Sequence, residues 1–450
     1  MSSRLLFLIS SFIAAWIMAF SSGSTLVFGI SYLLTGVLVI SYLLAWLSTR
    51  DVSLRRYTRT ERGQVGQYVE ETFEVLNNSG LPKLWLEVED YSTMPWHDAS
   101  RVISSLGHHS RERWQVRTLC TQRGWFRLGP MNLRSGDPLG VFDVESPLDA
   151  TGSMVVFPLV VDLTSFEPSV SDLSGGEARR QRTYQLTTNV ASIRDYAPGD
   201  SLNRIHWPTT ARTGRLMTKE FELDPTADIW IYMDLYSRAQ FGKVGVETRP
   251  EVGLFAYKNR ASRGANGTNR VSLPPVTTEY CISIAASLAR YFLMRDRSVG
   301  LSAYSTSREF LQTDRGERQM NKVLETLAVI QAEGKLPFAQ VIANDSVRLN
   351  RNDTIIAISA DPNPDWATAL YESQRRGVNS IAVVIDGSTF GSDDDRNAEQ
   401  DLTLNTPADY VDLAEKLATS GISYYIVKEG DSLSDVLSQP VNIDTGRIAR

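Results

Sequence analysis

The sequence is poor in cysteine, with only two among 450 residues. Cys120 and Cys281 lie far apart and form no Cys-x-x-Cys pair, so they indicate neither a disulfide framework nor a zinc site, and a reducing compartment fits best. Positive charge is also in deficit, because 46 Lys and Arg stand against 52 Asp and Glu. The net charge of −6 argues against a general nucleic-acid-binding protein, which would need a basic surface to neutralise phosphates.

The apolar residues crowd into the first fifty positions. Thr25–Leu47 contains no charged residue and is long enough for a helix that crosses a hydrocarbon core about 30 Å thick. Leu5–Phe20 is equally free of charge but short, and it reaches the required length only when Ser21 and Ser22 are added. The polar turn at 21–24 lies between the two runs. The pattern predicts a hairpin of two transmembrane helices.

Positive charge predicts the orientation of this hairpin. Arg4 precedes the first run, five arginines follow the second run, and the turn between them carries no charge. Because cytoplasmic flanks are enriched in Lys and Arg, both ends of the hairpin are expected in the cytoplasm, at the inner membrane of a bacterium. A signal peptide cleaved near Ala19–Ser21 is the alternative, although the second run would still anchor the product. The five following arginines are Arg50, Arg55, Arg56, Arg59 and Arg62.

Short alternating segments follow, over residues 51–165. Gln67–Val75, Leu84–Glu89 and Arg113–Arg117 alternate between apolar and polar residues and are rich in β-branched and aromatic side chains. A period of two residues is typical of half-buried antiparallel strands. Turn residues at 77–80 and 135–138 separate these strands. The segment is therefore expected to form an all-β, sandwich-like module.

Residues 226–450 show a different pattern, after a polar linking segment at 166–225. Apolar strand runs alternate with helical stretches, which predicts an α/β domain with a mostly parallel sheet and helices on both faces. The predicted strands are Ile229–Met233, Val299–Tyr304, Thr354–Ser359, Ser380–Ile385 and Ile422–Val427, and the helices Thr278–Arg297, Arg315–Glu333, Pro364–Arg376 and Pro407–Thr419. Two long loops are expected within the domain, at Gln240–Val276 and Gly387–Glu399. With residues 1–50 as the membrane hairpin, the fold class is multidomain.

The linking segment carries the most specific motif of the chain. Arg194-Asp195-Tyr196-Ala197-Pro198-Gly199-Asp200, Arg204-Ile205-His206-Trp207, Ala211-Arg212 and Lys219-Glu220-Phe221-Glu222 follow one another within thirty positions. This motif resembles the family called domain of unknown function fifty-eight. Arg123–Pro130 with Asp137–Phe142 is similar to the segment that precedes the motif in that family, and the carboxy-terminal domain resembles a von Willebrand factor A fold.

The resemblance covers nearly the whole chain and implies partners. Members of the family are usually encoded beside a MoxR-type AAA+ ATPase, often with other von Willebrand A proteins and a transglutaminase-like membrane protein. The implied role is that of an accessory or adaptor to the ATPase in assembly, maturation or envelope stress.

A von Willebrand A domain binds Mg²⁺ through an Asp-x-Ser-x-Ser loop after its first strand, because this hard cation prefers hydroxyl, carboxylate and water oxygens. The corresponding loop here begins at Asp234, and Tyr236 and Arg238 stand in place of the two serines. The site is therefore degenerate, and no metal is expected. Asp361 and Asp386 also end predicted strands, so an acidic cluster at that edge of the sheet stays open as an alternative.

The central motif permits three interpretations. Its charged residues could form an ion-pair clamp between domains, or its Arg and Trp residues could anchor a partner. Catalysis would use His206 as general base with Asp200 orienting it, but no nucleophile, phosphate-binding loop or metal set accompanies them. The residues assigned to the interaction or interdomain motif are Arg194, Tyr196, Gly199, Asp200, Arg204, His206, Trp207, Arg212, Lys219 and Glu220.

The sequence thus favours a membrane-anchored scaffold or adaptor that has no cofactor, binds no nucleic acid and works with the AAA+ ATPase. A hydrolase that uses His206 and neighbouring carboxylates is the alternative. An outward-facing adhesion module would require the opposite topology and a working metal loop.

Overall fold

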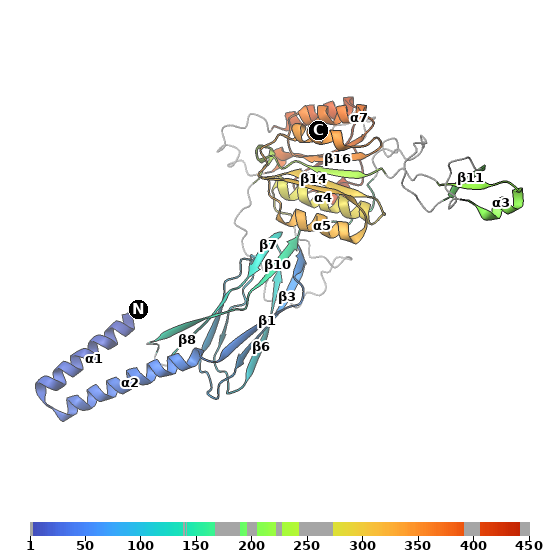
Figure 1. Cartoon of the computed structure of the whole chain (residues 1–450). Helices are drawn as coiled ribbons and strands as arrows, with labels where there is room; N and C mark the ends of the chain where they lie inside the picture. The colour runs from blue at the N-terminus through green and yellow to red at the C-terminus, as the bar shows by residue number, and fades with distance from the viewer. Residues whose placement is uncertain are drawn as a thin grey trace, which may run out of the picture. The chain divides into compact units, whose positions relative to one another are not determined.

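The computed structural model describes residues 3–137, 140, 142–166, 190–195, 205–221, 227–242, 273–390 and 406–441, with the backbone alone at 3–6, 190–195 and 219–221. Contacts divide the chain near Leu159 into two compact units. Figure 1 labels their elements, and each unit is described by itself.

Two helices open the first unit, α1 (Ser3–Ser22) and α2 (Thr25–Thr49). Gly23 makes the turn between them in the left-handed region, at φ +63°, where a side chain would be strained. The helices pack through Trp16, whose indole nitrogen donates to the Thr35 hydroxyl at 3.3 Å and whose ring lies against Tyr32. Of the described helices, α2 alone is long and apolar enough to cross a membrane. Both predicted segments are helical, and α2 is a candidate membrane span by its length and composition.

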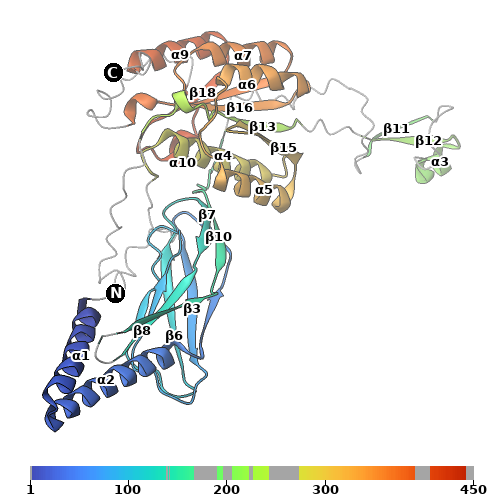
Figure 2. The same ribbon diagram turned by 60° about the vertical axis from the view of Figure 1, so that its left-hand side comes forward.

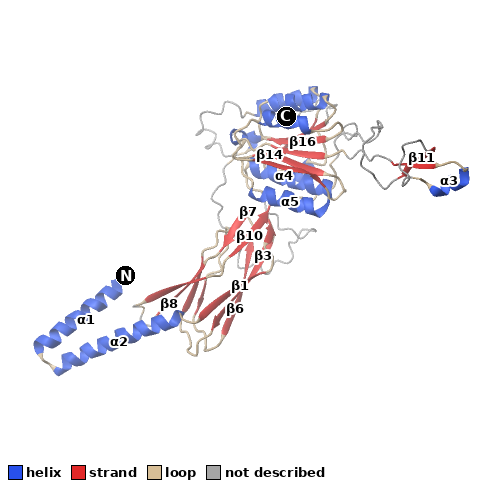
Figure 3. Cartoon of the chain, viewed as in Figure 1, coloured by secondary structure: helices blue, strands red, loops and turns tan. Residues whose placement is uncertain are grey.

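Strands alone build the module that follows, within the described residues of 51–159 (Figure 3). One sheet pairs β1 (Val52–Thr58), β3 (Tyr68–Asn77) and β6 (Arg111–Leu119) antiparallel. A second has the order β5-β4-β8-β9, formed by Arg101–Ile103, Leu86–Asp90, Met131–Gly136 and Asp143–Leu148. The third joins β2 (Arg62–Gln64), β10 (Gly152–Phe157) and β7 (Gly124–Leu128). The three strands predicted from alternation are all present.

Apolar side chains from the first two sheets meet in one core, as in a sandwich. Phe73 on β3 and Trp114 on β6 stack at 5.4 Å and pack with Leu86, Val88 and Leu133 of the opposite sheet. The alternation of β3 places every second side chain on this buried face. The core therefore forms because the period of the sequence matches the period of the strand.

The second unit contains the α/β domain, whose six-stranded sheet has the order β15-β14-β13-β16-β17-β18. All neighbours are parallel except β14 and β15. The strands, in this spatial order, are Arg308–Asp314, Val299–Tyr304, Ile229–Met233, Thr354–Ser359, Asn379–Ile385 and Ser423–Val427. The predicted parallel sheet is confirmed, and β15 is an additional antiparallel edge strand.

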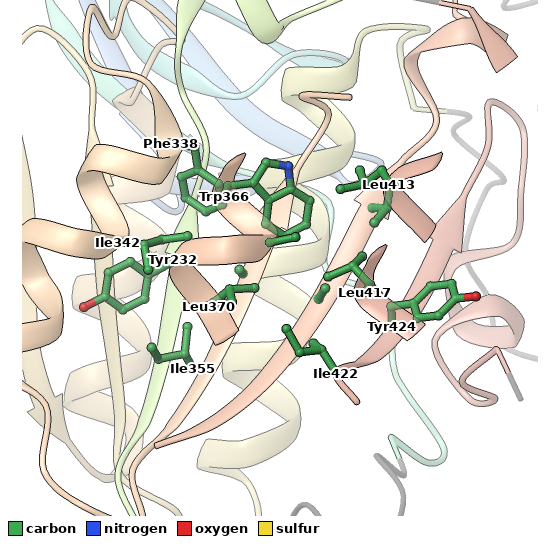
Figure 4. Close-up of a cluster of buried hydrophobic side chains, with 14 of the residues drawn as sticks. Tyr232, Phe338, Ile342, Ile355, Trp366, Leu370, Leu413, Leu417, Ile422 and Tyr424 are labelled. Atoms are coloured by element: carbon green, nitrogen blue, oxygen red, sulfur yellow. The ribbon is translucent and has the colours of Figure 1, made fainter. Parts of the chain in front are cut away.

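Helices cover both faces of this sheet (Figure 2). One face carries α6 (Phe338–Asp345), α7 (Asp365–Arg375) and α9 (Pro407–Thr419), and the other α4 (Thr277–Leu293), α5 (Gly316–Val329) and α10 (Leu433–Val436). Trp366 is the largest side chain buried under the first face, where it packs with Phe338, Leu370 and Leu413 (Figure 4). The four predicted helices are confirmed, whereas α6 and the short α10 were not predicted.

The segment 160–166 belongs to this second unit. The sequence pattern had assigned its residues up to 165 to the β-module. Its Val161 amide donates to the Ser287 hydroxyl on α4 at 2.9 Å. Phe166 stacks on Tyr425 of β18 at 4.9 Å and is buried. These contacts hold the segment against the helix α4 side of the domain before the chain enters the linking segment.

Candidate functional site

The parallel sheet has a topological switch point between β13 and β16. The chain leaves β13 for β14 on one side and later adds β16 on the other, with Met233 paired to Ile358 across the two strands. In open α/β sheets, ligands bind beyond the carboxyl ends of the strands at such a point. Asp234 follows β13 directly and Asp361 follows β16 by two residues, so the fold brings these two acidic residues to the switch point.

Both carboxylate oxygens of Asp234 already have partners. Its Oδ1 accepts from the Tyr236 amide at 3.0 Å, and its Oδ2 accepts from the Ser359 hydroxyl at 2.6 Å. Ser359 in turn accepts from the Asp361 amide at 2.9 Å. The Asp234 side chain is only 1% exposed. Its carboxyl group therefore ties the first loop of the switch point to the second.

Burial raises the pKa of Asp234 to about 7 from an ordinary value of 3.8, although the hydrogen bonds from Ser359 and Tyr236 act in the opposite direction. The charge of Asp361 contributes to the increase. Burial also raises the pKa of Asp361 itself, against a hydrogen bond from the Asn363 amide. Burial therefore opposes the ionisation of both neighbouring carboxyl groups.

A polar layer closes the site from helix α4. The Gln240 side chain donates to the Asp234 carbonyl at 3.0 Å and accepts from the hydroxyls of Thr277 and Thr278 at 3.0 and 2.9 Å. Gly334 bonds to the Leu235 carbonyl at 2.8 Å, and a side chain at that position would meet backbone oxygens. These hydrogen bonds hold the loops around Asp234 together.

These residues do not fit a divalent cation. The loop after Asp234 offers Tyr236 and Arg238, of which Arg238 is a cation itself and lies exposed on a single turn of 3₁₀-helix, η2 (Ser237–Ala239). Among the described residues, no three His, Cys, Asp or Glu side chains are placed to share a metal ion. Asp386, the third acidic residue at this edge, accepts from the amide and hydroxyl of Ser388 and caps its own turn, η4 (Gly387–Thr389).

The central motif forms a second candidate site. Strands β11 (Val190–Asp195) and β12 (Met217–Phe221) pair antiparallel, with Arg194 opposite Thr218 and Ile193 opposite Lys219. Helix α3 (Trp207–Thr213) lies between them in sequence and ends at Gly214, whose φ of +67° terminates the helix. Ile205 bridges to Thr218, so the segment before α3 is joined to β12.

His206 caps helix α3. Its Nδ1 accepts from the Thr209 amide at 3.3 Å and lies 2.7 Å from the Thr209 hydroxyl, while its own amide donates to the Met217 carbonyl at 2.8 Å. A capping residue satisfies amide groups that the first helical turn leaves without acceptors. The Nδ1 atom that an orienting carboxylate would contact in a catalytic pair is therefore occupied by the cap.

The two apolar residues around His206 differ in burial. Ile205 is 4% exposed, whereas Trp207 is 64% exposed at the first position of α3. Arg212 is also exposed, on the last turn of the same helix. A tryptophan left this exposed contributes little to packing, and Ile205 is the packed member of the pair.

Several predicted site residues lie outside the part of the chain that the structure describes. Tyr196, Gly199, Asp200 and Arg204 lie outside the described residues, as do 243–272 of the first long loop and 391–399 of the second. The side chains of Arg194, Lys219 and Glu220 also lie outside them. The ion-pair clamp therefore stays a prediction.

A buried charged cluster in the β-module was not predicted. Arg56 forms two hydrogen bonds with Glu71, at 3.0 and 2.7 Å, and His97 Nε2 lies 3.0 Å from Asp90 and 3.2 Å from Glu71. The other ring nitrogen of His97 lies 2.8 Å from the Thr118 hydroxyl. All four titratable side chains are at most 4% exposed.

This cluster is a polar part of the core. Burial alone would raise the pKa of Asp90, but hydrogen bonds from His97 and Ser92 and the charges of His97 and Arg56 outweigh it and lower the pKa. The sequence did contain a signal for this cluster. In the alternating pattern of β3, Glu71 stands between Val69 and Phe73 at a position whose side chain points to the buried face. Since solvent does not reach these side chains, their role is to hold β1, β3 and β4 together.

The central motif also carries the likeness to known proteins. The family "Protein of unknown function DUF58" matches residues 192–269. The "Uncharacterized protein YeaD" of Bacillus subtilis (strain 168) is 29% identical over 143 residues, which are 32% of this chain and 35% of that protein. The match thus spans about a third of the curated relative. Both findings support the family that the motif predicted.

Solved structures resemble the chain only weakly. The CARDB domain of a Pyrococcus furiosus protein in complex with di-metal ions is 18% identical and covers 24% of this chain and 87% of that one, with a TM-score of 0.19. BslA, a bacterial hydrophobin, is 7% identical over 24% of this chain and 95% of that one, with a TM-score of 0.16. Scores this low carry no conclusion about fold or function.

Proposed function

We propose that this chain is a membrane-anchored scaffold without enzymatic activity, which presents its central motif to a MoxR-type AAA+ ATPase in assembly, maturation or envelope stress. In this proposal α1 and α2 both cross the membrane and the soluble domains face the cytoplasm. The α/β domain is a von Willebrand factor A-like domain whose metal loop is degenerate. Other von Willebrand A proteins or a transglutaminase-like membrane protein are further candidate partners.

The observation that carries the proposal is the exposure of Trp207. This side chain is 64% exposed inside the segment that matches the family, while its neighbours Ile205 and His206 are used in packing and capping. Exposed tryptophan is costly to leave in water and is enriched among the residues that dominate binding energy at protein interfaces. Arg212, exposed on the same short helix, has the other side-chain type typical of such anchors.

The chemistry of the described residues supports a scaffold over a hydrolase. Asp234 is buried and bonded through both oxygens, and His206 Nδ1 is engaged by Thr209. General acid–base catalysis needs a titratable group within reach of the substrate, with a second group to orient it. Neither residue offers that arrangement, so no observation favours the hydrolase as a second candidate.

The architecture supports the von Willebrand A-like assignment. The sheet is doubly wound, its first strand β13 lies near the centre, and its antiparallel strand β15 is confined to one edge. The degenerate loop at Asp234 lies at the switch point, where the metal loop of such a domain would be expected. A partner would then be recognised by protein contacts and not through a shared cation.

Affinity capture from mild detergent tests the proposal. The tagged full-length chain should retain the AAA+ ATPase, and Trp207→Ala should weaken its retention by about tenfold or more, as for an interface anchor. Tyr371→Ala is the matched control, because Tyr371 is 42% exposed on helix α7 and should leave retention unchanged. Equal retention of the ATPase by the wild type and Trp207→Ala would refute the assigned surface. Its absence from every capture would refute the partnership.

A further inference from the structure

The carboxyl end of α2 is fixed to the β-module without a linker. Helix α2 ends at Thr49 and β1 begins at Val52, so only two residues separate the membrane helix from the first strand. The buried Lys83 ammonium donates to the carbonyls of Leu47 and Arg50, at 2.5 and 3.0 Å. A cation there satisfies terminal carbonyl groups and is favoured at the negative end of a helix dipole.

The same end of α2 also packs on the second sheet of the module. Helix α2 contacts β8 and β9, and Figure 1 shows α2 beside β8. The Tyr42 ring lies 5.6 Å from the ring of Phe142, which directly precedes β9. Ser41 and Ala45, one helical turn apart, are 3% and 0% exposed. The Tyr42–Phe142 contact shows that the module touches α2 well before the helix ends at Thr49.

Helix length sets the depth at which this contact lies. The 25 residues of α2 span about 37 Å, whereas a hydrocarbon core is about 30 Å thick. With Thr25 at the outer boundary, the inner boundary falls near Ala45. The contact between Trp16 and Tyr32 leads to the same inner boundary. Because α1 and α2 are antiparallel, this contact places Arg4, the charged residue at the start of α1, opposite roughly Leu44 of α2. The contact of the β-module with α2 thus begins at the inner boundary of the hydrocarbon.

Exposed apolar side chains gather at this level. Leu81 and Leu84 flank Lys83 in sequence and are 52% and 58% exposed, while Tyr42 and Trp46 on α2 are 58% and 46% exposed. Arg50 lies over the Trp46 ring at 4.6 Å. Aromatic side chains with adjacent positive charge are typical of the headgroup layer. These four side chains, Tyr42, Trp46, Leu81 and Leu84, are called the membrane-side rim.

We infer that the membrane-side rim lies in the headgroup layer of the bilayer, so that the β-module rests on the lipid surface in a fixed orientation. This inference rests on the proposed membrane anchoring and adds a lipid-binding surface to it. The apolar side chains of the rim remove their surface from water against lipid. The two-residue connection and Lys83 transmit that orientation from α2 to the strands.

Depth-dependent fluorescence quenching tests the inference on the full-length chain in phosphatidylcholine–phosphatidylglycerol vesicles. An environment-sensitive fluorophore is attached to Leu81→Cys, Leu84→Cys, Val39→Cys or Trp125→Cys. Cys120 and Cys281 are buried, and labelling of the unsubstituted chain measures any background from them. Val39 is 55% exposed within α2, and Trp125 is 57% exposed on β7, at the end of the module away from α2 (Figure 1).

The expected pattern has three levels. A spin label in the lipid tails should quench the fluorophore at Val39 most strongly, a spin label near the headgroup should quench those at 81 and 84, and neither should quench the one at Trp125. Lack of lipid quenching at 81 and 84, with Val39 still quenched, would overturn the inference and leave the anchor intact. Lack of quenching at Val39 would instead overturn the anchor. Protection of 81 and 84 from both lipid quenchers and aqueous iodide would show a protein contact and also overturn the inference.

Discussion

Replacing Asp234 by asparagine should flatten the dependence of unfolding free energy on pH. The pKa of this buried carboxyl group is raised from 3.8 to about 7, so the folded chain holds a proton that the unfolded chain releases. The wild type is therefore most stable at a pH below the pKa of this group in the unfolded chain. Its stability falls as the pH rises towards the pKa of the group in the folded chain. The loss should therefore occur between about pH 4 and pH 7.

The magnitude follows from the gap between the two pKa values. Each tenfold difference in proton affinity is worth about 1.4 kcal/mol, so the gap from 3.8 to about 7 corresponds to about 4 kcal/mol. Asparagine has nearly the same shape and carries no charge at either end of this range. Its oxygen can still accept from the Tyr236 amide, but its NH₂ group cannot accept from the Ser359 hydroxyl as the ionised carboxylate does, which costs about 1 to 3 kcal/mol.

Urea unfolding of a fragment that begins at Val160 measures this difference, with fluorescence of the buried Trp230 and Trp366 as the signal. The wild type should lose stability relative to Asp234→Asn as pH rises through the range. Asp412→Asn, an exposed substitution on α9, is the control and should follow the wild type. Parallel curves for the wild type and Asp234→Asn would refute the linkage between this proton and folding.

Three further outcomes are expected. Titrating Mg²⁺ into the fragment that begins at residue 51 should give no saturable heat of binding and no shift in its melting temperature. A Mg²⁺ site that is present in this fragment and lost in Asp234→Ala would contradict the proposal that the loop at Asp234 binds no metal. Ile205→Ala should accelerate limited proteolysis of the central motif, because truncating this buried side chain lowers the unfolding free energy by about 2 to 4 kcal/mol. Trp207→Ala should leave the rate of proteolysis unchanged, because Trp207 is exposed. Equal acceleration in both variants would mean that Trp207 is packed. Glu71→Gln should lower the unfolding free energy by about 3 to 5 kcal/mol, because Arg56 stays buried without its counter-charge. Glu112→Gln, at a partly exposed ion pair with Arg101, should change it by less than about 0.5 kcal/mol. Similar effects of the two substitutions would refute a structural role for the cluster.

Periodicity was enough to locate most elements of the α/β domain. Its central strands are short, fully buried apolar runs, such as Ile229–Met233 and Thr354–Ser359, and each helix has a well-defined apolar stripe. The edge strand Arg308–Asp314 escaped prediction because it is half-buried and mixes charged with apolar residues. Helix Phe338–Asp345 escaped because its eight residues are too few for a helical period to stand out.

The candidate sites depend on contacts that no local pattern contains. Asp234 and Ser359 are 125 residues apart in sequence, and only the switch in strand order brings them to 2.6 Å. The sequence correctly located Asp234 at a strand end but could not show that its carboxyl group is buried and bonded. For the central motif, the sequence identified the residues, and the structure separates the buried Ile205 from the exposed Trp207.

Reporter fusions test the central claim, that the chain is anchored in the membrane with its soluble domains in the cytoplasm. A fluorescent protein that folds only in the cytoplasm, fused after Arg450, should be bright, and alkaline phosphatase at the same position should be inactive. Alkaline phosphatase inserted in the turn at Gly23 should be active, since both helices cross the membrane in this account. Active phosphatase after Arg450 with a dark fluorescent protein would place the soluble domains outside the cytoplasm and contradict the claim.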